Sequence, residues 1–254
     1  MAPRSAICDS RRVFDHVTLR VSDRGESERF YDTVLGELGI DRSGEGEGFT
    51  EWSDFSVAAA SRAAPVTRRL HVGFAAPTQE HVDAFWTAGT SAGYMDDGRP
   101  GPRPRYGDDY YGGFLRDPDG NSVEAVHHDT LRRGGAIDHV WIRVDDLQRS
   151  RRFYETVAPY GGFRMAGERP DRVRFAGESG SFSIVDGRPT EGLHLAFAAD
   201  GPEPVERFHR ELLAAGYEDN GGPGERPQYH PGYYAAFVRG PDGANIEIVH
   251  HAGR

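Results

Sequence analysis

The chain has 254 residues, of which 37% are hydrophobic, and its formal net charge is −10 at pH 7. This surplus of acidic side chains excludes general nucleic-acid binding, which needs basic patches that contact phosphates. No apolar run is long enough to span a bilayer, so no membrane partner is expected. The single cysteine, Cys8, excludes an intrachain disulfide and favours a reducing compartment, so we expect a cytoplasmic protein.

The first predicted elements form one short mixed unit. Residues 13–21 alternate apolar and polar side chains, which predicts a half-buried strand. Residues 26–38 carry apolar side chains at helical spacing. A glycine-rich loop then leads to residues 49–60, which have room for two short strands. This succession is a β-α-β-β(-β) unit.

A second unit of the same kind follows. It starts with the strand of Leu70-His71-Val72, continues with a helix from Thr78 to Gly93, and ends with the strand that carries Glu124. Between the helix and the last strands lies a loop, residues 96–109, that is dense in glycine, proline and arginine. Its length suggests a functional loop rather than a simple connection.

The second half of the chain repeats the first at a shift of 123 positions. Helices are expected at 148–157 and 204–215, and a second long loop at 219–232. We therefore predict an α+β protein of four βαβββ units, with one domain at residues 12–128, a linker at 129–136 and a second domain at 137–251.

Two histidines and one glutamate recur at the same shift. Each glutamate lies in an apolar strand, where a buried carboxylate needs a cation, a proton or a metal. A strand histidine taken alone is more often a hydrogen-bonded core residue than a ligand, and duplication copies both kinds. Two imidazoles and one carboxylate nevertheless suit a divalent metal with open positions, such as Fe, Mn, Zn or Ni. The predicted ligands are His16, His71 and Glu124, and their copies His139, His194 and Glu247.

Two arrangements of the units satisfy this pattern. Each half can assemble its own site, or the halves can exchange units. We favour sites within each half, because the linker is short and the constant shift preserves each triad as a block.

Other polar residues are candidates for contacts around the metal. Arg20 and Arg143 share a strand face with His16 and His139. Further candidate substrate contacts are Arg105, Tyr111 and Tyr234. Candidate catalytic groups in the two long loops are Tyr106, Tyr229 and His230.

These motifs resemble the vicinal oxygen chelate superfamily, which includes glyoxalase I, fosfomycin-modifying transferases, extradiol dioxygenases and bleomycin-resistance proteins. The resemblance spans nearly the whole chain as two tandem glyoxalase-like domains. It is carried by Phe14-Asp15-His16-Val17, Leu70-His71-Val72 and Asp117–Glu124 with their second-half copies. It implies curled mixed sheets around central cavities and a metal-dependent dioxygenase, lyase or isomerase-like activity on a small oxygen-rich or aromatic substrate.

Departures from the family pattern narrow this expectation. Glyoxalase I-like members carry a fourth ligand, a glutamate, where this chain has Ser56 and Ser183, so glyoxalase I itself is disfavoured. Drug-binding relatives usually lack the metal ligands, but a small-molecule binding or resistance protein without catalysis is the alternative. We expect a small-molecule substrate and a monomer or homodimer.

Overall fold

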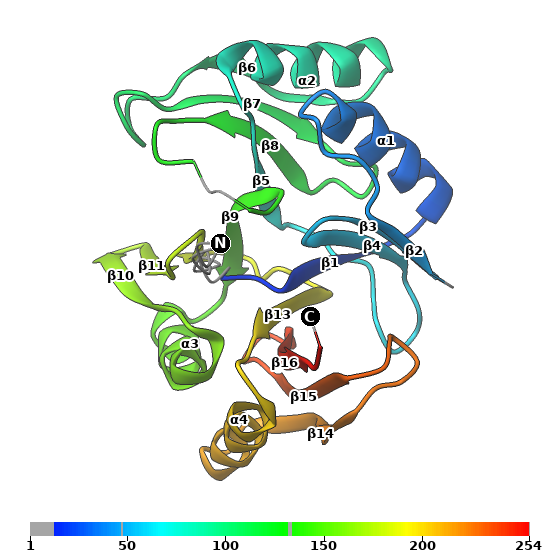
Figure 1. Ribbon diagram of the computed structural model, residues 1–254. Coiled ribbons are helices and arrows are strands. Elements are labelled where there is room, and N and C mark those ends of the chain that lie inside the picture. Colours follow the sequence, from blue (N-terminus) through cyan, green and yellow to red (C-terminus); the bar gives the residue numbers. More distant parts are fainter. Residues whose placement is uncertain (1–12, 47, 132–133, 254) are drawn as a thin grey trace, which may run out of the picture.

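The computed structural model describes residues 13–46, 48–131 and 134–253 (Figure 1). Cys8, residue 12 and part of the predicted linker lie outside the described residues. Within those residues the chain forms 16 strands and four helices. The strands build two curled sheets of eight strands each, so the predicted α+β fold of tandem glyoxalase-like units is confirmed.

The first sheet, called here the β1–β13 sheet, combines the beginning of the chain with its end. The central strands β1 and β13 run antiparallel, and each has a parallel neighbour on its other side. From edge to edge the strands are β14 (Glu218–Glu225), β15 (Tyr233–Arg239), β16 (Asn245–His251), β13 (Leu193–Ala198), β1 (His16–Val21), β4 (Phe55–Ala59), β3 (Phe49–Trp52) and β2 (Gly44–Gly46).

The second sheet, called the β5–β9 sheet, is built from the middle of the chain. Its central strands β9 and β5 are again antiparallel, with parallel neighbours outside them. From edge to edge the strands are β10 (Arg164–Arg169), β11 (Arg172–Ala176), β12 (Ser181–Asp186), β9 (Ile137–Val144), β5 (His71–Ala75), β8 (Ser122–His127), β7 (Tyr111–Arg116) and β6 (Asp96–Pro102).

Each sheet therefore joins one unit of the first half to one unit of the second half. Strand β1 pairs with β13, with Thr18 opposite His194, rather than with β5 of its own half. The preference for sites within each half was wrong. The physical reason is that the first strands of the units carry the same alternating pattern, so β1 can pair with either partner without changing which side chains are buried.

The helices pair within each half of the chain, whereas the central strands of the sheets pair between the halves. Helix α1 (Arg24–Gly36) packs against α2 (Gln79–Ser91), and α3 (Leu147–Gly161) packs against α4 (Pro202–Ala214), as Figure 1 shows. Helix α3 stops where Gly162 takes a φ of 66°, a left-handed conformation that glycine adopts without strain. The two units of each half therefore contact each other through their helices, and the two halves pair through the strands β1 with β13 and β5 with β9.

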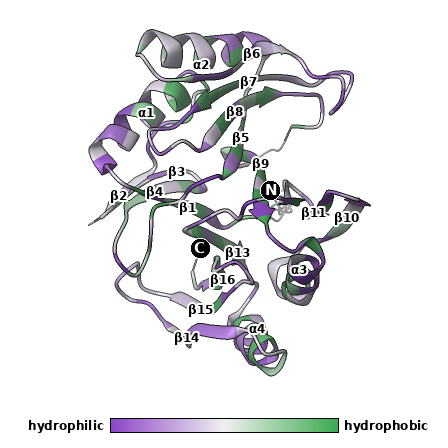
Figure 2. Cartoon of the chain, turned by 180° about the vertical axis from the view of Figure 1, so that it is seen from behind, coloured by the Kyte–Doolittle hydropathy of each residue, from purple (hydrophilic) through white to green (hydrophobic). Residues whose placement is uncertain are grey.

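The buried core connects the two sheets. Phe14, which precedes β1, lies with its ring centroid 6.1 Å from that of Phe182 in β12 and 5.9 Å from that of Phe197 in β13. Figure 2 shows hydrophobic residues on the central strand β13 and hydrophilic residues on the edge strand β14. Fixing three rings from three units in one cluster holds the sheets in a defined relation.

The sequence pattern missed part of the strand content. The predicted loops 96–109 and 219–232 begin with strands β6 and β14, whose pairing with their neighbours is interrupted by register shifts. Strand β10 was not predicted, because all six of its residues are exposed and show no apolar alternation. No helix in the described part of the chain is long and apolar enough to cross a membrane.

Two candidate metal centres

Strand register brings the predicted ligands together in two groups. On the β1–β13 sheet, His16 and Glu247 lie on either side of Ala196, each opposite it in the pairing. Residue His194 is two positions before Ala196 on the same strand face. The exchange of units therefore puts His16 of the first half beside His194 and Glu247 of the second half. We call this cluster the His16 site.

The His16 site has short distances between donor atoms. Nε2 of His16 lies 3.2 Å from Nε2 of His194, and Nε2 of His194 lies 3.0 Å from Oε2 of Glu247. Nε2 of His16 and Oε2 of Glu247 are 3.7 Å apart. The glutamate is 1% exposed, so its charge has no bulk water to solvate it.

The β5–β9 sheet builds the corresponding cluster from His71, Glu124 and His139, which we call the His139 site. Nε2 of His71 lies 3.0 Å from Oε2 of Glu124 and 3.1 Å from Nε2 of His139. Nε2 of His139 is 3.3 Å from the same carboxylate oxygen. Gly73 lies beneath the His139 ring, where a Cβ atom would come within 2.4 Å of Cε1, so this glycine leaves room for the imidazole.

The donor sets fit a divalent cation. In each cluster two Nε2 atoms and one carboxylate oxygen all lie within 4.8 Å of one another. The two nitrogens face each other, and at most one hydrogen can occupy the space between them. A cation at the centre satisfies all three lone pairs at once, as two imidazoles and a carboxylate do at open metal sites.

The Nδ1 atoms of His16 and His139, which point away from the centre of each cluster, also have hydrogen-bond partners. Nδ1 of His16 lies 2.8 Å from Asp15, and Nδ1 of His139 lies 2.9 Å from Asp138. A carboxylate that accepts from Nδ1–H fixes the tautomer whose Nε2 is free to bind a metal. The sequence suggested no role for either aspartate.

The remaining histidine of each site has a neutral partner. Nδ1 of His71 lies 3.1 Å from the Ser122 hydroxyl, which can accept its hydrogen. Nδ1 of His194 lies 2.8 Å from the side-chain amide of Asn245. Here Nδ2 of Asn245 faces Nδ1 of His194, because Oδ1 of Asn245 accepts from the Asn220 amide at 2.7 Å; turning both amides over would let Nδ1 of His194 donate and leave its Nε2 free.

The aspartate partners change the acidity of their histidines. Burial lowers the pKa of His16, but the hydrogen bond to Asp15 and nearby negative charges outweigh it and raise the pKa to about 9. At His139 burial is outweighed in the same way by Asp138 and by the site glutamate, and the pKa rises to about 10. Without a cation, these two imidazoles are protonated at neutral pH.

The pKa values of His71, His194 and Glu124 are shifted in the opposite direction, below their ordinary values. Burial lowers the pKa of His71 and of His194 more than their hydrogen bonds to glutamate raise it. Burial raises the pKa of Glu124, but the two histidines outweigh it and hold the pKa at about 2. The His139 site therefore pairs one imidazolium and one neutral imidazole with a carboxylate.

The second oxygen of each glutamate is held by a tyrosine. The hydroxyl of Tyr233 donates to Oε1 of Glu247 at 2.6 Å, and that of Tyr110 donates to Oε1 of Glu124 at 2.8 Å. These contacts leave Oε2 turned towards the histidines.

In the pairs Tyr110-Tyr111 and Tyr233-Tyr234, the sequence pointed to the second tyrosine as the substrate contact. Tyr111 and Tyr234 were expected to contact the substrate, but their hydroxyls donate to Asp83 in α2 and Glu206 in α4. Hairpin register would have distinguished them, because Phe237 lies opposite Glu247 and Tyr233 is four residues earlier on the same face of β15.

A chain of hydrogen bonds extends outward from the His16 site. Asp15 also contacts Nε2 of His251 at 2.9 Å, and Nδ1 of His251 lies 2.9 Å from Nε2 of His230. His230 is thus connected to the site through two residues. At the His139 site, Nε2 of His128 lies 3.3 Å from Asp138.

A cavity of about 340 Å³ opens at the His139 site. Tyr106 and Arg143 line it together with the site residues, and their roles as a catalytic group and a substrate contact stay predictions. The guanidinium of Arg105 instead lies over the Tyr106 ring, 4.6 Å from its centroid. Tyr229 is 54% exposed and packs on Tyr233.

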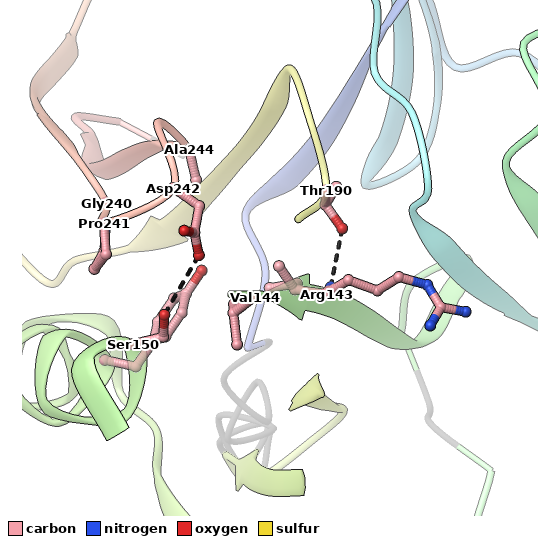
Figure 3. Close-up of a pocket in the computed structure, with 10 residues that line it drawn as sticks. Arg143, Val144, Ser150, Thr190, Gly240, Pro241, Asp242 and Ala244 are labelled. Carbon is pink, nitrogen blue, oxygen red and sulfur yellow. Dashed lines mark hydrogen bonds between the residues drawn. The ribbon is translucent and has the colours of Figure 1, made fainter. Parts of the chain in front are cut away.

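A much smaller cavity of about 10 Å³ lies on the other side of β9 (Figure 3). It is lined by Tyr154, Asp242 and Gly240, and Ser150 lies 3.5 Å from Asp242 there. The first half fills the corresponding position with Asp117, which accepts from the Tyr31 hydroxyl. The cavity therefore arises from loss of a side chain and is no larger than one water.

Comparisons with known proteins agree with the fold. The family model of the Glyoxalase/Bleomycin resistance protein/Dioxygenase superfamily matches residues 13–125 and 136–248. A virulence protein of Salmonella typhimurium is 27% identical over 135 residues, which cover 50% of this chain and 92% of that protein.

Solved structures resemble nearly the whole chain. Glyoxalase I from Zea mays is 20% identical, with 95% of this chain and 93% of that chain covered and a TM-score of 0.68. A candidate dioxygenase from Bacillus subtilis is 14% identical, with 96% and 86% covered and a TM-score of 0.65. At these identities the likeness concerns the fold alone. Because the family model covers most of both halves, the chain belongs to the glyoxalase/bleomycin resistance protein/dioxygenase superfamily.

Proposed function

We propose that the protein is a divalent-metal enzyme of the vicinal oxygen chelate type, with a metal at the His16 site and another at the His139 site. The observation that carries the proposal is the convergence of two Nε2 atoms and one carboxylate oxygen within 4.8 Å in each cluster. Fe, Mn, Zn and Ni all accept such donors. When bound, the metal would supply a Lewis acid for vicinal oxygens of a small oxygen-rich or aromatic substrate.

The surrounding residues prepare the donors for this role. Asp15 and Asp138 hold Nδ1 of a histidine, so its Nε2 points to the centre of the cluster. Tyr110 and Tyr233 hold one glutamate oxygen and leave the other for the cation. Donors fixed in this way do not need to be reordered when the substrate binds.

The donor count favours a dioxygenase, lyase or isomerase-like reaction over the glyoxalase I reaction. Each cluster has three donors within the described residues. Ser56, at the position of the fourth ligand, instead shares a hydrogen bond of 2.8 Å with Thr18. A neutral serine at Ser56 or Ser183 supplies no fourth carboxylate.

Metal analysis of protein purified without chelators tests the proposal. We expect about two metals per chain, and one after either Glu124→Gln or Glu247→Gln, because the amide keeps the size but loses the charge that a cation requires. The double variant should bind none. Glu37→Gln, on the exposed end of α1, is the control and should retain both.

Two results would contradict the proposal. A Glu247→Gln variant with unchanged metal content and affinity would remove this residue from the site. Failure of the wild-type protein to take up iron, manganese, nickel or zinc on titration would instead favour a small-molecule binding or resistance protein without catalysis.

A further inference from the structure

The two sites share their donors but differ in what surrounds them. Opposite His194 in the pairing of β1 and β13 is Thr18, and opposite His71 in the pairing of β5 and β9 is Trp141. The Thr18 hydroxyl is already bonded to Ser56. The indole of Trp141 instead lines the cavity of the His139 site.

This cavity has aromatic walls. The ring centroid of Trp141 lies 5.6 Å from that of His71 and 5.8 Å from that of Tyr106, which meets it edge-on. Phe114 closes another side, 6.1 Å from His71. A volume of about 340 Å³ lies within the range of small-ligand pockets, and its walls suit a flat ring beside the metal donors.

The same cavity has cationic groups. Arg69, Arg116 and Arg143 all line it. Arg69 pairs with Glu191, and Arg116 lies 2.7 Å from Asp97. For Arg143, no carboxylate oxygen of the described residues lies within 4.0 Å of the guanidinium.

Arg143 is also directed away from Asp242, which lies on the other side of its strand. Figure 3 shows its side chain extending away from the small cavity that contains Asp242, while its backbone N–H bonds to Thr190. Arg143 follows His139 and Trp141 on one face of β9. Its guanidinium can therefore form a two-pronged contact with an anion on the metal side of the strand.

The two sites also differ in the charge of one neighbouring residue, which is acidic near the His16 site and basic near the His139 site. Glu51 in β3 lies opposite Ser56 on the β1–β13 sheet. The corresponding residue opposite Ser183 is Arg174 in β11. On the same face of β11, Arg172 lies over the Trp141 ring, 5.1 Å from its centroid. An anion is thus favoured at the His139 site and opposed by Glu51 at the His16 site.

We propose that the His139 site selects an aromatic carboxylate, with its ring against Trp141 and its carboxylate on Arg143, whereas the His16 site does not. This specificity rests on the proposed metal function, because the metal would hold the other end of the substrate. The net charge of the chain is −10 and disfavours anion binding in general, so the arginines of this cavity provide a local exception.

The test compares two probes that differ in one carboxylate: 3,4-dihydroxybenzoate and catechol. Titration calorimetry on the metal-loaded protein should give at least about tenfold tighter binding of the acid, since a charge-assisted contact contributes more than about 1.4 kcal/mol. Arg143→Gln should abolish the preference, and Arg143→Lys should keep part of it. Arg20→Gln, the matched change at the His16 site, should leave the preference unchanged.

Tryptophan fluorescence adds a readout that does not depend on turnover. The acid should quench Trp141, and Trp141→Thr, which installs the residue found at the His16 site, should remove the quenching and weaken both probes. Equal affinity for both probes, or a preference that survives Arg143→Gln, would overturn the proposal. A preference lost in Arg20→Gln would overturn the assignment to the His139 site.

A second pair of probes separates this proposal from the metal function. Benzoate and benzyl alcohol lack the vicinal hydroxyls that would chelate a metal, and their binding can be compared on chelator-treated protein. A benzoate preference that depends on Arg143, in a protein that binds no metal, would retain the anion site while rejecting the metal centre. Two metals with no preference in either pair would reject the anion site alone.

Discussion

At the residue scale, Asp15 and Asp138 each contact the histidine that follows them in the proposed metal sites. In a variant background that keeps only the His139 site, Asp138→Asn should lower metal affinity by about 10–100-fold, because the amide no longer stabilises the ligand imidazole as a carboxylate does. Competition with a chromogenic chelator measures the change. Glu247→Gln provides the background.

The matched experiment uses the other site. In the Glu124→Gln background, Asp15→Asn should weaken metal binding to a similar extent, whereas Asp138→Asn should have no effect there, since the emptied site is its own. An Asp138→Asn effect of the same size on both sites would indicate a general loss of structure rather than a role beside His139.

The sequence pointed to the candidate ligands but not to their hydrogen-bond partners, and the reason is geometric. His16, His194 and Glu247 stand out because a polar residue in an apolar strand is unusual. Asp15 precedes His16 directly, and adjacent strand residues are expected to face opposite sides. In the structure the Asp15 carboxylate turns back to its neighbour's Nδ1, which depends on side-chain torsion rather than on strand periodicity.

At the scale of secondary-structure elements, a buried aspartate ties the start of β9 to the first unit. Oδ1 of Asp54 accepts backbone N–H groups from Ala136 at 2.7 Å and Ile137 at 3.1 Å. Asp54→Ala removes this acceptor from two buried backbone donors and should lower the free energy of unfolding by about 2–4 kcal/mol. Urea denaturation measures this loss.

The exposed Asp41, in the loop after α1, is the control for this experiment. Asp41→Ala should change the free energy of unfolding by less than about 0.5 kcal/mol. If Asp54→Ala were equally neutral, the contact between the first unit and β9 would not contribute to stability.

Elements with regular apolar periodicity were predictable, and irregular edge strands were not. The four helices were all expected because their buried residues recur at helical spacing, as in α1 with Phe30, Val34 and Leu35. Strand β14 is rich in glycine and carries a proline, and its pairing with β15 shifts twice in register. Such a segment has no period-2 signal, so its strand character comes from the neighbouring strand.

At the scale of the whole molecule, the exchange of units was not decided by any local pattern. Leu70 with the first residues of β5, and the first residues of β13, form the same apolar-histidine-apolar pattern, so either strand suits β1 as a partner. What selects β13 for β1 is contact among several units, such as the packing of Phe14 against Phe182 and Phe197. Single-sequence periodicity contains no information on such long-range contacts.

At both proposed sites, metal affinity should depend on pH through the ligand histidines. The raised pKa values of about 9 at His16 and about 10 at His139 stabilise the metal-free fold fully below about pH 6.5, and this stabilisation is lost as the pH rises through those values. A metal requires both imidazoles unprotonated, so its affinity should rise over the same range.

Near neutral pH, each metal should therefore displace about one proton, or about two per chain. Calorimetric titrations in two buffers with different ionisation enthalpies measure the number. The melting temperature of the metal-free protein should fall between about pH 7 and pH 10, whereas a saturating metal should remove most of that fall. Metal binding without proton release would contradict the raised pKa values.

The exchanged architecture makes a specific prediction for the isolated second half, residues 134–254. In the intact chain its His139 meets His71 and Glu124, and its His194 meets His16. Alone, the fragment lacks those partners but contains strands equivalent to both: β9 corresponds to β1, and β13 to β5. Two copies can pair β9 of one with β13 of the other, which rebuilds the missing arrangement by exchange.

We therefore expect the fragment to bind about one metal per chain only as a dimer, with His139 from one copy and His194 and Glu247 from the other. Sedimentation velocity with and without metal should show dimerisation promoted by the cation. His139→Asn and His194→Asn fragments, each unable to bind metal alone, should recover about a quarter of the sites when mixed in equal amounts, because about half of the dimers are mixed and one of the two sites in each mixed dimer keeps every ligand. A monomeric fragment that binds metal with wild-type affinity would show that a half can close its own site, and would contradict the exchange seen here.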